Sequence, residues 1–529
     1  MDQVSVACDR QLAGRDAPLF DLARGPTEEG GETLVLDAGG HAGMMPQWGS
    51  RYAARVPVTG RGDVAERLPG VDAGFLYMET PTQHMHTLKV SFLDVSSVPG
   101  GYSFEIFAAG LGERLHLLPP FRRRVQKVPL QLHHPVWVED ADLDLSAHLR
   151  RVVVPAPGGK HEVEQVIGDI ASTPLDRSRP LWEISVLEGL ADGTVGVVAK
   201  MHHAVADGVA ASALLANVMD TGAPLDVSPW LPQPGPSSRE LVTHAVIGQL
   251  RQLVRLPGLL VRTLRSVLEL VRRRRAMPVS PPRPILDTPK VSFNGAITAR
   301  RSFAAASLPI ADVRAVRAAT GVTFNDVVLG IVAGALRSWL EQQGEHPTAS
   351  LTAGVPVATD GPGAAERLGG NRVSNMFTSL CTDIADPVER LQHIALVTQQ
   401  AKVVQEALGL QMLQDWVQYT PPGPFTAFMR LYSRFRGADR HPAPFNVVVS
   451  NVPGPREPVS VGGARLTDLY SVGPILEGIG LNITVWSYLD RLNFSALACP
   501  DTLPDLDELV AHLRPALDEL GARTRGASA

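Results

Sequence analysis

Seven residues in the first half of the chain, His202-His203-Ala204-Val205-Ala206-Asp207-Gly208, lie between two apolar runs of different character. Residues 195–201 have the length and composition of a buried strand, whereas residues 209–219 have the composition of a helix. The sequence therefore predicts a strand, a loop and a helix in this order. This arrangement places two imidazoles at a strand end and a carboxylate where it can cap the helix.

Histidine changes its charge near neutral pH, so an imidazole at a strand end can take a proton from an alcohol, amine or thiol. The structural alternative is a strand end with two incidental histidines and an aspartate that only caps the helix. The complete string, in its predicted context, favours catalysis over chance. The catalytic candidates are His203, His202, Asp207 and Gly208.

A β-hairpin is predicted directly before this loop. Residues 181–187 alternate like a half-buried strand, and Asp192-Gly193 is a frequent turn pair. With Asp192 and Gly193 at the tip, Trp182 lies opposite His203, and Glu183 lies opposite His202. Trp182 is therefore a candidate wall of the site, although packing in the core is the more ordinary role for a tryptophan.

The composition bounds the class of protein. The 529 residues are 44% hydrophobic and 19% charged, which is typical of globular chains with two or more domains. A net charge of −5 argues against nucleic acid as a partner. The three cysteines are far apart, so we expect no disulfide framework or zinc site and a reducing compartment. We also expect no transmembrane helix and no signal peptide, because no apolar run has the required length and position.

Stretches rich in helix and strand breakers divide the chain into four parts. Residues 1–62 are predicted to be a disordered extension. Residues 63–225 and 291–525 each combine strand-like and helical runs, and residues 226–290 form a Pro-rich linker. The clearest predicted elements are strands at 88–93, 152–154, 181–187, 195–201, 445–452, 481–486 and 492–498, and helices at 209–219, 325–340 and 506–520.

The linker contains a helical segment, 238–276, that is expected to be interrupted at Pro257. Arginines far outnumber acidic residues along it, and Leu and Val fill most other positions. A basic amphipathic helix suits an anionic membrane surface. The same pattern suits a helix that packs its Leu/Val stripe on its own protein and exposes its arginines to water, so both interpretations stay open.

Several motifs together resemble those of bacterial wax ester synthase/acyl-CoA:diacylglycerol acyltransferases. They are the histidine string at 202–208, Pro174-Leu175-Asp176-Arg177-Ser178-Arg179-Pro180-Leu181-Trp182-Glu183, Asn325-Asp326, Asp72-Ala73-Gly74-Phe75-Leu76-Tyr77-Met78-Glu79, Gly370-Asn371-Arg372-Val373-Ser374-Asn375-Met376 and Ser450-Asn451-Val452-Pro453-Gly454-Pro455. The resemblance covers residues 65–522, in the order typical of that family. It implies an α/β (α+β) fold like that of chloramphenicol acetyltransferase and other CoA-dependent acyltransferases, in which two halves with mixed sheets flank a central tunnel.

The resemblance implies an O-acyltransferase that moves a long-chain acyl group from acyl-CoA to the hydroxyl of diacylglycerol, which gives triacylglycerol, or of a fatty alcohol, which gives a wax ester. His203 is then the general base and His202 a supporting residue. Acyl-CoA is a co-substrate, and no cofactor or metal is expected. The resemblance and the basic helix also imply a cytoplasmic protein in peripheral contact with the inner membrane face or with lipid droplets.

Two roles are open for Asp207. It can orient the imidazole of His203, as in a catalytic triad, or it can cap the helix and pair with an arginine, for which Arg177 and Arg179 are the candidates. The resemblance favours the structural role. Gly208 is expected to give the turn its backbone freedom and to let substrate approach closely.

Further site residues are less closely tied to the chemistry. Asn325 is the candidate donor to the oxyanion, or else an N-cap with Asp326 in the first helical turn. Glu79 either lines the tunnel or is a surface carboxylate. His84 and His86 are spaced to share a strand face and, without further ligands, are not interpreted as a metal site.

The sequence contains no G-x-S-x-G elbow and no cysteine near the histidines, so direct attack without an acyl-enzyme is expected. Two other functions remain open. A stand-alone condensation-type acyltransferase of peptide or polyketide metabolism carries the same histidine string, but its flanking motifs match less well. A non-catalytic lipid-surface protein would use the basic helix, but it would have no need of the intact histidine string.

Overall fold

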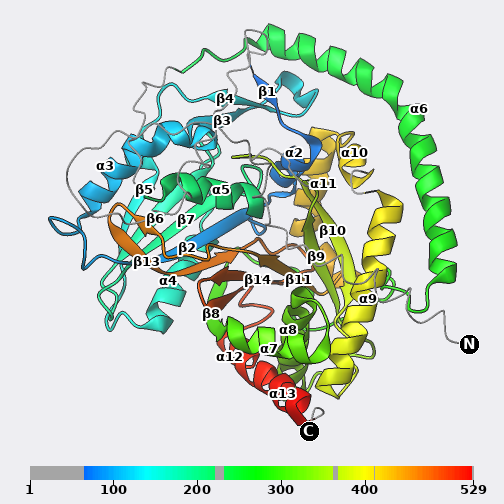
Figure 1. Ribbon diagram of the computed structural model, residues 1–529. Coiled ribbons are helices and arrows are strands. Elements are labelled where there is room, and N and C mark those ends of the chain that lie inside the picture. Colours follow the sequence, from blue (N-terminus) through cyan, green and yellow to red (C-terminus); the bar gives the residue numbers. More distant parts are fainter. Residues whose placement is uncertain (1–64, 221–231, 361–366, 410–411, 527–529) are drawn as a thin grey trace, which may run out of the picture.

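Two large sheets and the helices around them make up the molecule (Figure 1). The computed structural model describes residues 65–220, 232–360, 367–409 and 412–526, so the predicted extension at 1–62 lies outside the described residues. The first six-stranded sheet has the order β12-β13-β2-β7-β6-β5, and the second has the order β10-β9-β11-β14-β15-β8. A three-stranded sheet, β1-β4-β3, is separate from both. The fold is α/β with mixed sheets, as predicted.

The bounds of the elements follow. The strands are β1 (Glu66–Arg67), β2 (His86–Asp94), β3 (Arg123–Gln126), β4 (Val136–Glu139), β5 (Leu149–Val153), β6 (Trp182–Glu188), β7 (Val195–His202), β8 (Ser302–Pro309), β9 (Thr352–Ala358), β10 (Val373–Ser379), β11 (Val447–Val452), β12 (Ser460–Val461), β13 (Ala464–Val472), β14 (Leu481–Tyr488) and β15 (Arg491–Ala498). The helices are α2 (Gly70–Met78), α3 (Phe104–Arg114), α4 (Lys160–Ser172), α5 (Gly208–Val218), α6 (Ser238–Ala276), α7 (Ile310–Thr320), α8 (Phe324–Gln342), α9 (Pro387–Leu408), α10 (Met412–Val417), α11 (Pro422–Arg434), α12 (Leu506–Ala511) and α13 (Leu513–Gly526).

Strand β13 joins the two parts of the chain. It lies late in the sequence, yet it pairs antiparallel with β2 of the first sheet, with Tyr470 opposite Val90 and Ser471 opposite Lys89. The chain then returns to the second sheet as β14. The sheets also share a core, in which Leu88 and Val198 of the first sheet pack with Phe303 of the second. The two halves are therefore joined both by the backbone and by apolar packing.

The register of the β6–β7 hairpin differs from the prediction. Trp182 lies opposite Met201 and Glu183 opposite Lys200, so the predicted partners His203 and His202 are wrong by two residues. The turn spans 190–193 and is closed by a 3.1 Å hydrogen bond from the Gly193 amide to the Leu190 carbonyl, with Gly193 at φ +75°. The glycine therefore occupies the last turn position instead of the tip. A shift of two residues leaves every side chain on its predicted face of the sheet.

Two helices differ from the prediction in where they are interrupted. Helix α6 continues through Pro257, where an interruption was predicted, and it curves around the outside of the molecule (Figure 1). A proline removes one backbone hydrogen bond and bends a helix without ending it when both flanks keep their own bonds. The C-terminal helix predicted at 506–520 is instead split into α12 and α13 at His512. Pro515, in the first turn of α13, cannot donate to the preceding turn, which explains the break.

In the described part of the chain, no single helix has both the length and the apolar composition needed to cross a membrane. Only α7 and α8 taken together reach that length, and they are bent by 107° relative to each other.

Candidate functional site

The predicted order of strand, loop and helix around the histidine string is confirmed. Strand β7 ends at His202 and α5 begins at Gly208. The His202 amide donates to the carbonyl of Leu181 at 2.9 Å, and the His203 amide donates to the carbonyl of Met85 at 2.7 Å. These two bonds fix the backbone at both histidines to the residues that directly precede β6 and β2.

The imidazole of His203 faces the junction between the halves. It is partly accessible, and its ring stacks on that of Phe75 in α2, with ring centroids 4.3 Å apart. Its Nδ1 lies 3.0 Å from the amide oxygen Oδ1 of Asn371, two residues before β10 begins. The base candidate is therefore held by one residue from each side of the junction.

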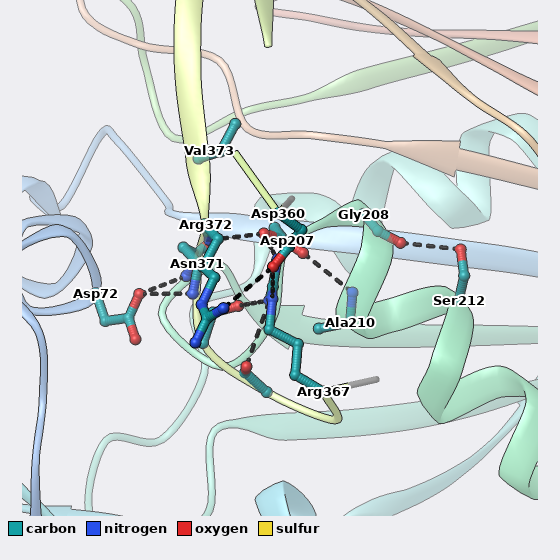
Figure 2. A network of polar contacts seen from close by, with 12 residues as sticks. Asp72, Asp207, Gly208, Ala210, Ser212, Asp360, Arg367, Asn371, Arg372 and Val373 are labelled. Carbon is teal, nitrogen blue, oxygen red and sulfur yellow. Dashed lines mark hydrogen bonds and ion pairs between the residues drawn. The ribbon is translucent and has the colours of Figure 1, made fainter. Parts of the chain in front are cut away.

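Asn371 determines which nitrogen of His203 carries the proton. The Asn371 side-chain Nδ2 donates to Asp72 Oδ1 and to the carbonyl of His203, both at 2.8 Å, and its backbone amide donates to Asp72 Oδ1 at 3.0 Å (Figure 2). Because an amide nitrogen donates and does not accept, Oδ1 must be the atom that faces the imidazole. Nδ1 of His203 therefore carries its hydrogen, and Nε2 keeps a free lone pair.

Burial sets the charge of this group. It lowers the pKa of His203 below its ordinary value, while the hydrogen bond to Asn371 raises it by a smaller amount. The imidazole is thus neutral at pH 7, as a general base must be. Burial also raises the pKa of Asp72 to about 7, against the opposing effect of its hydrogen bonds from Asn371.

His202 points away from this junction and is fully buried. Its Nδ1 accepts a 3.0 Å hydrogen bond from the Ala204 amide, so the proton is on Nε2, which lies 3.8 Å from Glu79 Oε2. Burial lowers the pKa of His202 to about 3. Glu79 is not a surface carboxylate, since its side chain is 9% exposed and its Oε2 lies 3.2 Å from Arg177 Nη1. His202 and Glu79 therefore have buried positions that stabilise the loop and do not face the junction between the halves.

Asp207 has a structural position. Its Oδ1 accepts from the Ala210 amide at 3.0 Å and so caps α5, while its Oδ2 accepts from the Arg372 amide at 2.9 Å and pairs with Arg367 (Figure 2). The predicted arginine partners were wrong, because Arg177 pairs with Glu79 and Arg179 with Asp176. Asp207 does not orient His203 either, because Nδ1 of His203 is hydrogen-bonded to Asn371.

Gly208 is the first residue of α5, and its small size serves packing. A Cβ on Gly208 would lie 3.2 Å from Cγ2 of Val452 at the end of β11, which is tighter than an ordinary contact. The group that approaches Gly208 closely is therefore a side chain from the second half of the protein.

The other predicted site residues lie apart from this chain of hydrogen bonds. Trp182 is in the core, where its ring stacks between Phe121 and His148. Asp326 completes the N-terminal cap of α8, and the N-cap is Thr323 and not Asn325. Asn325 is partly exposed on that first turn, and among the described residues its side chain has no hydrogen-bond partner. His84 and His86 stack with ring centroids 5.5 Å apart.

Sequence reasoning missed Asn371, Asp72 and Arg367 as site residues. Asn371 and Asp72 lie within motifs noted above, but nothing local gives them a role, since Asp72 and Asn371 are 299 positions apart. Their only sequence signal is that both are polar residues within motifs that carry the family resemblance.

Comparison with known proteins identifies the family. Residues 68–328 match the model of the wax ester synthase/diacylglycerol acyltransferase catalytic domain, and residues 369–521 match the C-terminal domain of the same family. Two Mycobacterium tuberculosis proteins that carry provisional names as diacylglycerol O-acyltransferases are each 40% identical to this chain. One aligns over 84% of this chain and 94% of its own length, and the other over 87% and 98%.

Solved structures give the same result. The wax ester synthase/diacylglycerol acyltransferase of Marinobacter aquaeolei VT8 superposes with a TM-score of 0.61 at 28% identity, over 87% of this chain and 99% of that one. The first condensation domain of the CDA synthetase superposes with a TM-score of 0.52 at 14% identity, over 86% of this chain and 96% of that one. At that identity the second similarity concerns the fold alone.

Proposed function

The chain belongs to the wax ester synthase/diacylglycerol acyltransferase family, and we propose that it moves a long-chain acyl group from acyl-CoA to the hydroxyl of diacylglycerol. Long-chain fatty alcohols are the second class of acceptor that the family name suggests. The observation that carries the proposal is the hydrogen-bonded series Asp72–Asn371–His203, which leaves Nε2 of His203 unprotonated at a partly accessible position.

In the proposed reaction the acceptor oxygen attacks the thioester carbonyl carbon while Nε2 of His203 takes the hydroxyl proton. The tetrahedral intermediate then collapses: the C–S bond breaks, and the imidazolium returns the proton to the departing CoA sulfur. Asn371 Oδ1 accepts from Nδ1 throughout, and its dipole stabilises the imidazolium. Asn325 lies in the first turn of α8, and its side-chain amide has no partner among the described residues, so it stays our candidate donor to the oxyanion.

One assay tests the proposal. Purified protein is incubated with palmitoyl-CoA and either dioleoylglycerol or hexadecanol, and triacylglycerol, wax ester and free thiol are measured. We expect thiol release that depends on the acceptor and equals the ester formed. Thiol release without ester would identify a thioesterase, and no release with either acceptor would refute the proposed activity.

Replacing Asn371 with alanine is expected to lower kcat by about 10- to 100-fold, because the imidazole loses the acceptor that fixes its tautomer and direction. The hydrogen bond from His203 to Asn371 raises the pKa of His203, so its loss lowers that pKa further. The acidic limb of the pH–rate profile, where activity falls as His203 becomes protonated, therefore moves to lower pH. A variant with wild-type kcat, or with an unmoved acidic limb, would contradict this role.

We further propose that the protein makes peripheral contact with an anionic lipid surface through α6. The inner side of this helix contacts the protein through both apolar and polar groups: Leu241 and Leu259 are buried, Gln252 donates to the Gln418 carbonyl at 3.0 Å, and Thr263 accepts from Trp416 at 2.9 Å. Most of its large apolar side chains instead point outward and are 40–81% exposed: Val246, Ile247, Leu250, Leu253, Val254, Leu260, Val261, Leu264, Val267, Leu268 and Val271.

This arrangement supports one of the two interpretations of the basic helix over the other. Only Leu241, Ala245 and Leu259 of α6 are buried, so most of the Leu/Val stripe does not pack on the protein. Arg251, Arg255 and Arg265 are exposed on the same helix. Apolar side chains flanked by arginines suit the boundary between anionic headgroups and acyl chains.

Changing Leu253, Leu260, Leu264 and Leu268 to glutamine is expected to reduce co-sedimentation with phosphatidylglycerol liposomes by at least about tenfold, since each buried leucine contributes roughly 1.5–3 kcal/mol. Glutamine keeps helix propensity. The matched control changes the same leucines to methionine, which keeps the apolar area and should keep binding. Turnover of a short, water-soluble acyl-CoA and alcohol should be unchanged. If the glutamine variant sediments like the wild type, this face does not contact lipid.

A further inference from the structure

Lys89 is a buried cation in the middle of the first sheet. It lies on β2, between Ser471 of β13 and Ala199 of β7, and is only 8% exposed. Its Nζ donates to Ser471 Oγ at 2.6 Å and lies 4.7 Å from the ring centroid of Trp486 in β14. An ammonium has three N–H donors, so one hydroxyl and one ring face leave it incompletely satisfied.

No carboxylate among the described residues forms an ion pair with Lys89. The acidic group that acts on it is Asp207, which raises the pKa of Lys89 against the larger effect of burial; the result is a pKa of about 8. Both oxygens of Asp207 are already occupied, by the Ala210 amide and by Arg367 with the Arg372 amide. Lys89 is therefore mostly charged at pH 7 and has donor capacity that the described part of the protein does not use.

The face of the sheet that carries Lys89 is partly open. Side chains on successive strand residues alternate between the two faces. On the opposite face, Leu88, Val90 and Val198 are completely buried. On the Lys89 face, Ser91, Val197 and Ala199 stay partly accessible, although β2 and β7 are inner strands. Solvent therefore reaches side chains next to Lys89 on this face of the sheet.

This face of the sheet is close to the catalytic residues. Val197, Leu215 of α5 and Val452 of β11 are partly buried and pack against the apolar cluster that contains Trp486. Val452 also contacts Gly208, at the end of the histidine string. Burial is the main cause that lowers the pKa of His203, and the positive charge of Lys89 lowers it further, so the two groups are near enough to interact. Lys89 is thus a hydrogen-bond donor on a partly accessible, largely apolar face near the base.

We propose that the Lys89 ammonium donates a hydrogen bond to an ester carbonyl oxygen of the acyl acceptor, so that Lys89 selects diacylglycerol over a simple long-chain alcohol. The inference rests on the proposed acyl transfer and specifies its acceptor. Diacylglycerol carries two ester carbonyls close to its reacting hydroxyl. A fatty alcohol has only that hydroxyl, and its methylene chain would cover the ammonium without offering an acceptor.

The energetic reason for selection is the cost of leaving a buried donor unpaired. A polar site that binds the wrong, apolar partner loses the hydrogen bond and cannot regain water. Hydrogen bonds to charged groups are strong enough for selectivity of about 10- to 100-fold in kcat/KM. Lys89 is a specificity-determining residue in this scheme, and it takes no part in proton transfer.

The first test compares the wild type with Lys89→Met, which keeps the length and most of the volume of the side chain but removes the ammonium. We expect kcat/KM for dioleoylglycerol to fall by about 10- to 100-fold and kcat/KM for hexadecanol to stay the same or rise. The control is Lys402→Met, a change at an exposed lysine of α9, which should alter neither value. An equal loss with both acceptors would overturn the proposal, because it would show a merely structural role.

The second test uses the unmodified protein, so it holds even if Lys89→Met fails to fold. Dioleoylglycerol is compared with the dialkyl ether of glycerol of the same chain length, which keeps the hydroxyl and lacks both carbonyls. We expect a preference of about tenfold or more for the ester. Equal use of ester and ether would overturn the role of Lys89 while leaving acyl transfer intact. Failure of the wild type to acylate any acceptor would instead refute the proposed function itself.

Discussion

His203→Ala is expected to lower acyl transfer from palmitoyl-CoA to dioleoylglycerol by about 10²–10⁴-fold, which is the usual contribution of a positioned general base. The reason is chemical: an alcohol is too weak an acid to ionise before it attacks, so its proton must leave during the attack. The fold should survive, because the imidazole is partly accessible and the loop is held by backbone bonds to Met85 and Leu181. The measurement is ester formation beside thermal unfolding.

His202→Ala is the matched control at the adjacent position. Its imidazole is fully buried, accepts from the Ala204 amide and faces Glu79, so its loss leaves a cavity and an unpaired amide. We expect a lower melting temperature and a smaller direct loss of kcat than with His203→Ala. If His203→Ala keeps near-native turnover, or if His202→Ala loses as much kcat without loss of stability, the roles of the two histidines are assigned wrongly.

Asp207→Asn is expected to destabilise the protein by roughly 1–3 kcal/mol, because it removes one of the two carboxylates that pair with Arg367 and leaves only Asp360. The side chains of Arg367 and Asp207 are 13% and 7% exposed, so water compensates little. Asparagine can still cap α5 through Oδ1, but its Nδ2 then faces the Arg372 amide, so the loss reports on that hydrogen bond as well as on the ion pair. The measurements are the melting temperature and the urea midpoint.

Two further variants separate the ion pair from other causes. Asp360→Asn removes the second carboxylate on Arg367, which is more exposed, and should cost less. The double change Asp207→Asn with Arg367→Met should be less destabilising than the sum of the single changes, because the ion pair between the two side chains is lost only once. An Asp207→Asn protein that is fully stable but inactive would instead indicate that Asp207 acts on His203 directly.

Local sequence determined the elements that carry the site. The apolar run before His202 and the helix-like run after Gly208 predicted β7 and α5 within one residue at each end, because strand and helix periods depend on neighbouring side chains. The capping chemistry at Asp207 follows from the same kind of local signal. The ordered motifs also predicted the fold, because the same set occurs in the wax ester synthase/diacylglycerol acyltransferase family and members of one family share a fold.

Tertiary structure alone decided the partners. Arg177, Arg179 and Arg367 carry the same charge, and only the path of the chain brings Arg367, 160 positions away, to Asp207. In the same way, Asn371 lies 168 positions from His203 and Asp72 lies 299 from Asn371, so no local pattern relates them. Tertiary structure also decided that most leucines of α6 point outward, because sequence periodicity shows which residues share one side of a helix but not what that side faces. Hydrogen bonds and ion pairs act over a few ångströms of space, and sequence separation says nothing about that distance.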